Sequence, residues 1–107
     1  MDRNAKAIRR QATWRAKLTQ ICELLACDEY AFSAHAVDKL YQNDWTEEDA
    51  ICAVMSGVLV KWQSDSASVD GKAYVIEGPD RYGNSLETVG KIMLGDGGKY
   101  YFFITCY

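Results

Sequence analysis

The sequence predicts an α+β fold, in which N-terminal helices precede a four-stranded antiparallel sheet. Up to residue 56, apolar side chains recur at helical spacing, whereas after Gly57 they alternate with polar ones at the strand period of two. Glycine-rich turns separate the alternating stretches. With 107 residues, 49% of them hydrophobic and 25% charged, the chain suits a single domain, residues 1–107, that is large enough to form a core.

Three helices are expected in the first half. The stretch from about Arg3 to Ala26 lacks glycine and proline and carries one apolar stripe, formed by Trp14, Leu18, Ile21 and Leu25. Ser33 is a good N-cap for a second helix, from Ala34 to about Gln42. The third begins with Thr46-Glu47-Glu48-Asp49, a close variant of a capping box, and runs to Ser56, after which Gly57 closes it.

Four strands are expected to follow, at about residues 58–63, 72–77, 85–94 and 99–107. The last is apolar on both sides, with Tyr101, Phe103 and Tyr107 opposite Phe102, Ile104 and Cys106. Such a strand should lie centrally and be covered on both faces. Helices would cover one face, and the long N-terminal helix, a partner chain or a ligand would cover the other.

Charge is distributed unevenly along the chain. The net charge is −3, yet the first twenty residues carry six basic residues and one acidic residue. An acidic body repels phosphate, so binding of RNA would use a local patch or the N-terminal basic residues Arg3, Lys6, Arg9 and Arg10, which could also contact a protein partner. The alternative is an ordinary solvated helix face.

The sequence also indicates where the protein resides and which sites it lacks. It contains no apolar run long enough to span a membrane and no signal-peptide segment, so we expect a cytoplasmic protein without membrane contact. Its four cysteines are then expected to be reduced thiols. Their spacing matches no standard zinc pattern, and no nucleotide fingerprint occurs. We expect neither a metal nor a cofactor.

His35, the only histidine, falls in the first turn of the second predicted helix. The positive end of a helix dipole disfavours imidazolium, so a neutral ring is expected there. Such a ring could act as a general base. The alternative is a structural side chain, hydrogen-bonded to a neighbouring loop.

Metal-independent RNA cleavage is compatible with the residues present, because it needs only a base, an acid and cations near the phosphate. His35 or Glu87 could be the base. The candidate cations and proton donors are Lys61, Lys72 and Lys91, and Tyr74, Tyr101 and Tyr107. Lysines and tyrosines of a sheet surface more often serve solubility and packing.

Several short motifs resemble a small bacterial family, the domain-of-unknown-function family number forty-two fifty-eight. They are Phe32-Ser33-x-His35-Ala36, Lys39, Asp49 with Ala53, Gly57, and Ile104-Thr105-x-Tyr107. The resemblance covers about residues 30–107 and leaves 1–29 as a basic N-terminal helical extension. It implies a RelE-like or barnase-like fold and kinship with ribonuclease toxins, some of which are encoded beside zinc-ribbon antitoxins.

The chain departs from this family at sites that bear on catalysis. Lys39 replaces the usual arginine, a second arginine is missing near Asn43 and Asp44, and Glu87 stands where histidine is common. Each change removes a cation or a proton-transfer group.

Two main functions are therefore predicted, beside a third hypothesis of nucleic-acid binding through Arg3, Lys6, Arg9 and Arg10. One is a RelE-like toxin, a metal-independent endoribonuclease or a relic of one, using His35, Lys39, Lys91 and Tyr107, with Glu87 as the alternative base. The other is a non-catalytic module that binds an antitoxin or another protein, or forms a homodimer, through the apolar sheet face and the basic N-terminal helix.

Overall fold

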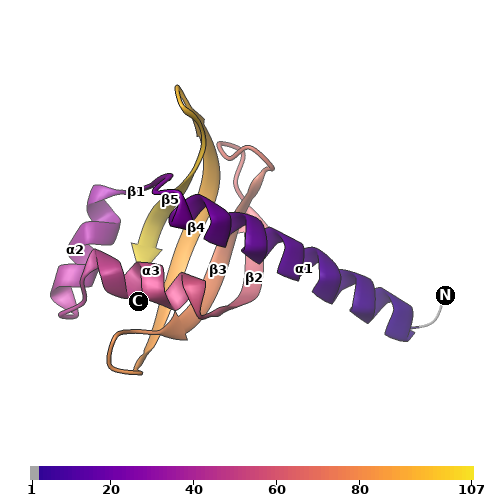
Figure 1. Cartoon of the computed structure of the whole chain (residues 1–107), viewed down its shortest axis with the longest axis horizontal. Coiled ribbons are helices and arrows are strands. Elements are labelled where there is room, and N and C mark those ends of the chain that lie inside the picture. Colours follow the sequence, from indigo (N-terminus) through magenta and orange to yellow (C-terminus); the bar gives the residue numbers. More distant parts are fainter. Residues whose placement is uncertain (1–2) are drawn as a thin grey trace.

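The computed structural model has a layered α+β architecture (Figure 1). It describes the backbone of residues 3–107 and the side chains of residues 12–107. In chain order, the described elements are α1 (Arg3–Ala26), β1 (Tyr30–Phe32), α2 (Ala34–Gln42), α3 (Glu47–Met55), β2 (Val58–Ser64), β3 (Lys72–Pro79), β4 (Ser85–Gly95) and β5 (Gly98–Cys106). The predicted order of helices before antiparallel strands is confirmed.

The strands form one sheet in the order β1-β5-β4-β3-β2. β2 to β5 pair in antiparallel fashion, but β1 adds a fifth strand, in which Tyr30–Phe32 runs parallel to residues 101–103 of β5. The prediction of a four-stranded antiparallel sheet was therefore wrong in strand number and type. A strand of three residues is too short to show alternation, and its partner lies far along the chain.

All three helices pack on the same face of the sheet (Figure 1). This main core includes Ile21 and Leu25 of α1, Ala36 and Leu40 of α2, and Ala53 and Val54 of α3, together with Tyr74, Ile76, Leu86, Ile92, Tyr101, Phe103 and Cys106 of the sheet. Trp14 and Leu18 pack against it, which confirms the predicted stripe of α1. No helix of the described chain covers the opposite face.

The predicted helix starts are confirmed by their caps. The Ser33 hydroxyl accepts the Ala36 amide at 2.9 Å. At α3, the Asp49 amide donates to Thr46 Oγ1 at 3.3 Å, and the Thr46 amide donates to Asp49 Oδ2 at 2.8 Å, which completes a capping box.

Aspartates stand at the turns that follow α1 and α2. Asp28 and Asp44 both have left-handed backbone, with φ of 59°, a conformation that aspartate tolerates better than most residues. In each turn the next amide donates to the carbonyl five positions back, at 2.9 Å. These Schellman-type turns reverse the chain directly after each helix.

A bulge in β5 changes the faces of its last residues. The pairing with β4 shifts between Val89 and Gly90, so Ile104 lacks a partner of its own. Cys106 joins Tyr101 in the main core, whereas Ile104 packs on the opposite face. The prediction that Cys106 lies opposite Tyr101 was wrong, because simple alternation does not anticipate an inserted residue.

Tyr101 lies at the centre of the main core. It crosses Gly90 so closely that a Cβ atom at position 90 would lie 2.4 Å from the ring. Its hydroxyl is fully buried and has no hydrogen-bond partner among the described residues. Burial raises the pKa of this phenol. Position 90 must therefore be glycine, although the Tyr101 hydroxyl forms no hydrogen bond with the described residues.

Replacing Tyr101 tests this packing. Tyr101→Phe removes an unpaired buried hydroxyl, so we expect the free energy of unfolding to stay constant or rise by about 1 kcal/mol. Gly90→Ala forces a clash and should lower it by roughly 1–3 kcal/mol. Urea denaturation measures both. A loss of more than about 1 kcal/mol in Tyr101→Phe would show that the hydroxyl has a partner.

Candidate functional site

His35 and Lys39 lie one turn apart on α2. The start of this helix is fixed to β5, because Ser33 donates through its amide to the Phe103 carbonyl at 2.9 Å and through its hydroxyl to the Ile104 carbonyl at 2.8 Å. His35 is exposed, and no described residue forms a hydrogen bond with its ring. Lys39 is partly buried. The imidazole is thus accessible but has no group that orients it.

Glu77, Glu87 and Tyr107 form a row on the face that the helices leave uncovered. Glu77 of β3 and Glu87 of β4 are direct cross-strand partners. Glu87 and Tyr107 exchange two backbone hydrogen bonds, of 2.7 and 2.8 Å. Tyr107 follows the inward-facing Cys106, so alternation places its side chain on the same face as Glu87. The two glutamates make this row acidic, and their like charges repel each other because they lie directly opposite.

Lys91 shares this face but is already paired. It lies four residues from Glu87 on β4, about 13 Å along the strand. Its Nζ atom lies 3.2 Å from Asp65 Oδ2, and its side chain is 15% exposed. Hydrogen bonds from the Ala67 amide and from Lys91 lower the pKa of Asp65. The charge of Lys91 is therefore neutralised within the chain.

The structure thus separates the predicted catalytic residues. His35 and Lys39 belong to α2, which packs on the covered face, whereas Lys91 and Tyr107 lie on the uncovered one. Only Tyr107 and the alternative base Glu87 are neighbours. For Arg3, Lys6, Arg9 and Arg10, the side chains lie outside the described residues.

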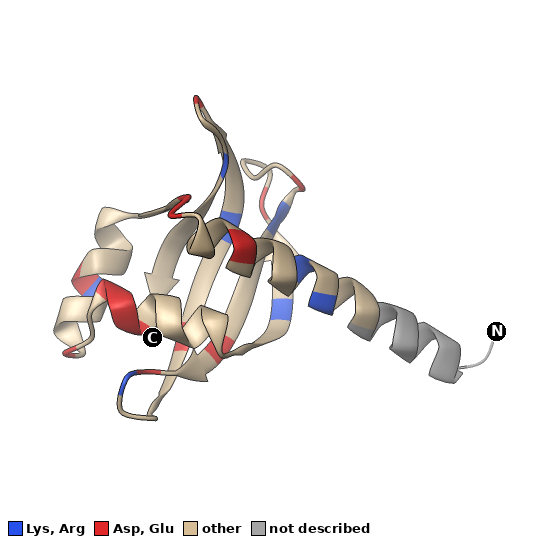
Figure 2. Ribbon diagram, viewed as in Figure 1, with Lys and Arg blue, Asp and Glu red and all other residues tan. Residues whose placement is uncertain are grey.

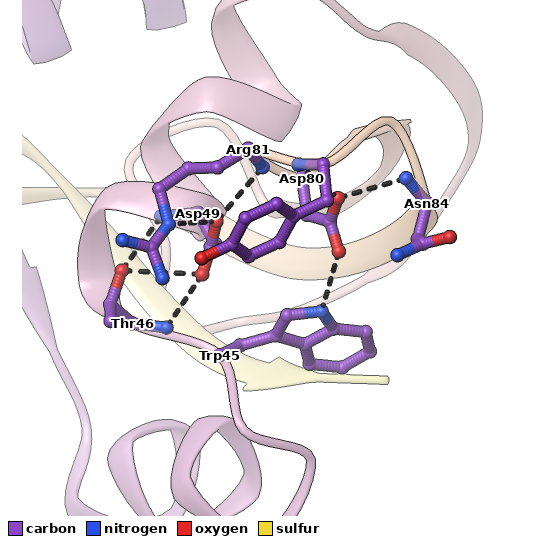
Figure 3. A network of polar contacts seen from close by, with 7 residues as sticks. Trp45, Thr46, Asp49, Asp80, Arg81 and Asn84 are labelled. Carbon is purple, nitrogen blue, oxygen red and sulfur yellow. Dashed lines mark hydrogen bonds and ion pairs between the residues drawn. The ribbon is translucent and has the colours of Figure 1, made fainter.

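A buried carboxylate network, which the sequence analysis missed, joins α3 to the turn between β3 and β4 (Figure 3). Asp49 is 1% exposed and accepts the amide and Nε of Arg81, both at 2.9 Å, in addition to the Thr46 amide. Asp80 accepts the Trp45 indole at 3.1 Å and the amides of Tyr82 and Asn84 at 2.8 Å. Each oxygen of the two carboxylates accepts at least one hydrogen bond from within the chain. The network therefore stabilises the fold and leaves no carboxylate oxygen unpaired for a ligand.

These donors decide the ionisation of both groups. Burial by itself would raise the pKa of Asp49 and of Asp80, but the hydrogen bonds outweigh it and lower both pKa values. For Asp49 the donors belong to Thr46 and Arg81, and for Asp80 they include Asn84, Tyr82 and Trp45.

A third aspartate joins α1 to the sheet. Asp70 accepts the Tyr74 hydroxyl and lies 3.1 Å from Lys17 Nζ. Burial and the hydrogen bond to Asp70 raise the pKa of Tyr74. Tyr74, one of the candidate proton donors, is therefore held by a structural partner.

The four cysteines are free, and burial raises the pKa of Cys106 to about 12. Within the described residues, no three side chains of His, Cys, Asp and Glu gather as a metal site would require. None of the helices in this part of the chain combines the length and hydropathy needed to cross a bilayer.

Exposed apolar side chains gather along the outer edge of the sheet. β2 is the last strand, and Val58, Val60 and Trp62 are 61%, 37% and 44% exposed. Met55, at the end of α3, is 46% exposed. We call these four residues the edge patch. The centre of the uncovered face is more closed, because Ala73, Val75 and Val89 are buried there.

Comparison of the chain with protein-family models, with curated proteins and with solved structures gave no match. The resemblance of residues 30–107 to a toxin-related family stays a prediction.

Asp49 provides a test of the network. Its folded-state pKa is lowered, so its contribution to stability is present above the unfolded value, near pH 4, and is lost as pH falls below it. We expect Asp49→Asn to cost about 2 kcal/mol at neutral pH and to flatten the acid limb of the stability curve. Unfolding measured from neutral pH to strong acid gives both values.

Asp38→Asn, at an exposed aspartate of α2, is the matched control and should follow the wild-type curve. Parallel acid limbs for wild type and Asp49→Asn would contradict the assignment.

Proposed function

We propose that this chain is a protein-binding domain that recognises an extended segment of its partner at the edge patch. The observation that carries the proposal is the position of four exposed large apolar side chains within residues 55–62, at an unpaired sheet edge. Long, exposed hydrophobic edge strands invite pairing and are usually protected. An edge left open in this way suits a partner strand.

Strand addition would use the residues of β2 on both sides of its register shift. The outer amides and carbonyls of an edge strand pair with the added chain, and alternate side chains supply specificity. Val58 and Trp62 offer apolar contacts on opposite faces, and Lys72 stacks 4.5 Å from the Trp62 ring centre, which orients the indole. The register shift between Leu59 and Lys61 interrupts β2, so the added strand would pair in two short segments.

The RelE-like fold belongs to the same proposal. Two helices followed by the antiparallel strands β2 to β5 support it, whereas the parallel strand β1, within the same residues 30–107, departs from what the resemblance implies. In that case the chain is a relic of a toxin without nuclease activity, and its partner is an antitoxin whose extended segment adds to β2.

Metal-independent RNA cleavage is the second candidate, and the pairing of Glu87 with Tyr107 favours it. Glu87 would take the proton of the ribose hydroxyl, and Tyr107 would donate one to the leaving oxygen. Two features weigh against it. Glu77 adds negative charge beside Glu87, and Lys91 is neutralised by Asp65. Phosphate would therefore meet an acidic row that contains no cation of its own, and among the described residues the exposed Lys61 of β2 is the free cation on the same face.

The edge patch can be tested with charge. Val58→Lys with Val60→Lys places two cations on the edge, which should weaken binding of a purified, identified partner at least tenfold, or about 1.4 kcal/mol. Tyr41→Lys, at an exposed aromatic on α2, is the matched control. Isothermal titration calorimetry measures the affinities. Equal affinities for wild type and the double variant would exclude the edge patch.

The catalytic alternative predicts a different pattern. On induced expression at matched levels, we expect wild type, His35→Ala, Glu87→Gln and Tyr107→Phe to leave growth and RNA equally intact. The measurement is RNA integrity with growth curves. RNA degradation by wild type that Glu87→Gln and Tyr107→Phe both abolish would establish the nuclease instead.

A further inference from the structure

An apolar groove of about 510 Å³ runs between α1 and α3. It is lined by Arg15, Leu18, Thr19, Cys22, Glu23 and Ala26 of α1, and by Met55 of α3. Leu18 and Cys22 are only partly buried, so this flank of α1 is left open after the helix has packed on the sheet. The groove is long enough to accept a helix, because residues 15–26 alone extend over about 17 Å.

One basic and one acidic side chain mark the two ends of this groove. Arg15 and Glu23 are both exposed, and neither forms an ion pair with another described residue. Lys17, on the other flank of α1, is paired with Asp70. In Figure 2 the described basic positions of α1 precede its acidic position along the helix. The unpaired charges are therefore of opposite sign and about 12 Å apart.

We propose that the groove binds α1 of a second copy of this chain, with the two helices antiparallel about a two-fold axis near Thr19. Thr19 is midway between Arg15 and Glu23, so the axis brings Arg15 of each copy to Glu23 of the other. A two-fold interface requires such self-complementarity, since each contact occurs twice.

The same register places apolar and small residues together. Cys22 meets Ala16 of the second copy, and Ala26 meets Ala12, all four on exposed or partly buried positions of α1. Small side chains allow two helix axes to approach closely. Met55 of each copy would then cover the added helix from the side of α3.

Charge symmetry favours a second copy over an unrelated helix. A purely basic or purely acidic helix would satisfy one end of the groove and repel the other, whereas an antiparallel copy satisfies both. A single helix pair buries less area than a standard interface, so we expect a reversible monomer–dimer equilibrium. This inference does not rest on strand addition at β2, although Met55 borders both surfaces.

Charge reversal gives the decisive experiment, with the full chain at matched concentrations in analytical ultracentrifugation. Glu23→Arg gives each copy two arginines at the paired positions, and Arg15→Glu gives each copy two glutamates. Each single variant should dimerise at least tenfold more weakly than wild type. The double variant Arg15→Glu/Glu23→Arg should regain the wild-type dissociation constant, and a mixture of the two single variants should form a heterodimer.

A chain that stays monomeric at every concentration would overturn the proposal. So would a double variant that remains as weak as the single ones, or single variants that fail to associate when mixed. Asp38→Arg, on α2, controls for net charge and should dimerise like wild type. Circular dichroism confirms that each variant is folded. Val58→Lys with Val60→Lys should leave the dimer intact, so failure at one surface is distinguishable from failure at the other.

Discussion

The parallel pairing of β1 with β5 is the contact on which the arrangement of the helices depends. Phe32 stacks on Phe103, with ring centres 4.2 Å apart and planes 2° from parallel. Ser33, the next residue, is bound to the β5 backbone and caps α2. The end of α1 and the start of α2 are thereby held at one edge of the sheet. Both helices turn back over the same face, and α3 completes that layer.

All three helices cover the same face of the sheet, and this arrangement determines which surfaces remain exposed for function. The described ion pairs are formed within the chain: Asp49 with Arg81, Asp65 with Lys91, and Asp70 with Lys17. These pairs fasten the two long turns and α1 to the body, so their charges serve the fold. The exposed surfaces left for a partner are mainly apolar, namely the edge of β2 and the groove beside α1, whose ends carry the unpaired charges of Arg15 and Glu23. Such surfaces favour association with protein over chemistry on a phosphate.

Local pattern predicted the parts of this fold that depend on neighbouring residues. The stripe of α1, the caps at Ser33 and Thr46, and the four antiparallel strands each have a signal within about ten residues. β1 and the bulge at Ile104 have none, because both arise from pairing with a distant strand. The same holds for the candidate site. His35 and Tyr107 were recognisable as chemical groups. The sequence could not show that Asp65 forms an ion pair with Lys91, or that Glu77 lies opposite Glu87 in the sheet.

We propose that this chain binds protein through apolar surfaces and has no phosphate site on its sheet. Nitrogen-15 NMR spectra of the labelled chain, recorded at low ionic strength while a short single-stranded RNA is added, test it most directly. We expect no saturable shifts at His35, Lys39, Glu87, Lys91 or Tyr107. Saturable shifts that cluster at Glu87, Lys91 and Tyr107 would contradict it and would locate an RNA site on the uncovered face.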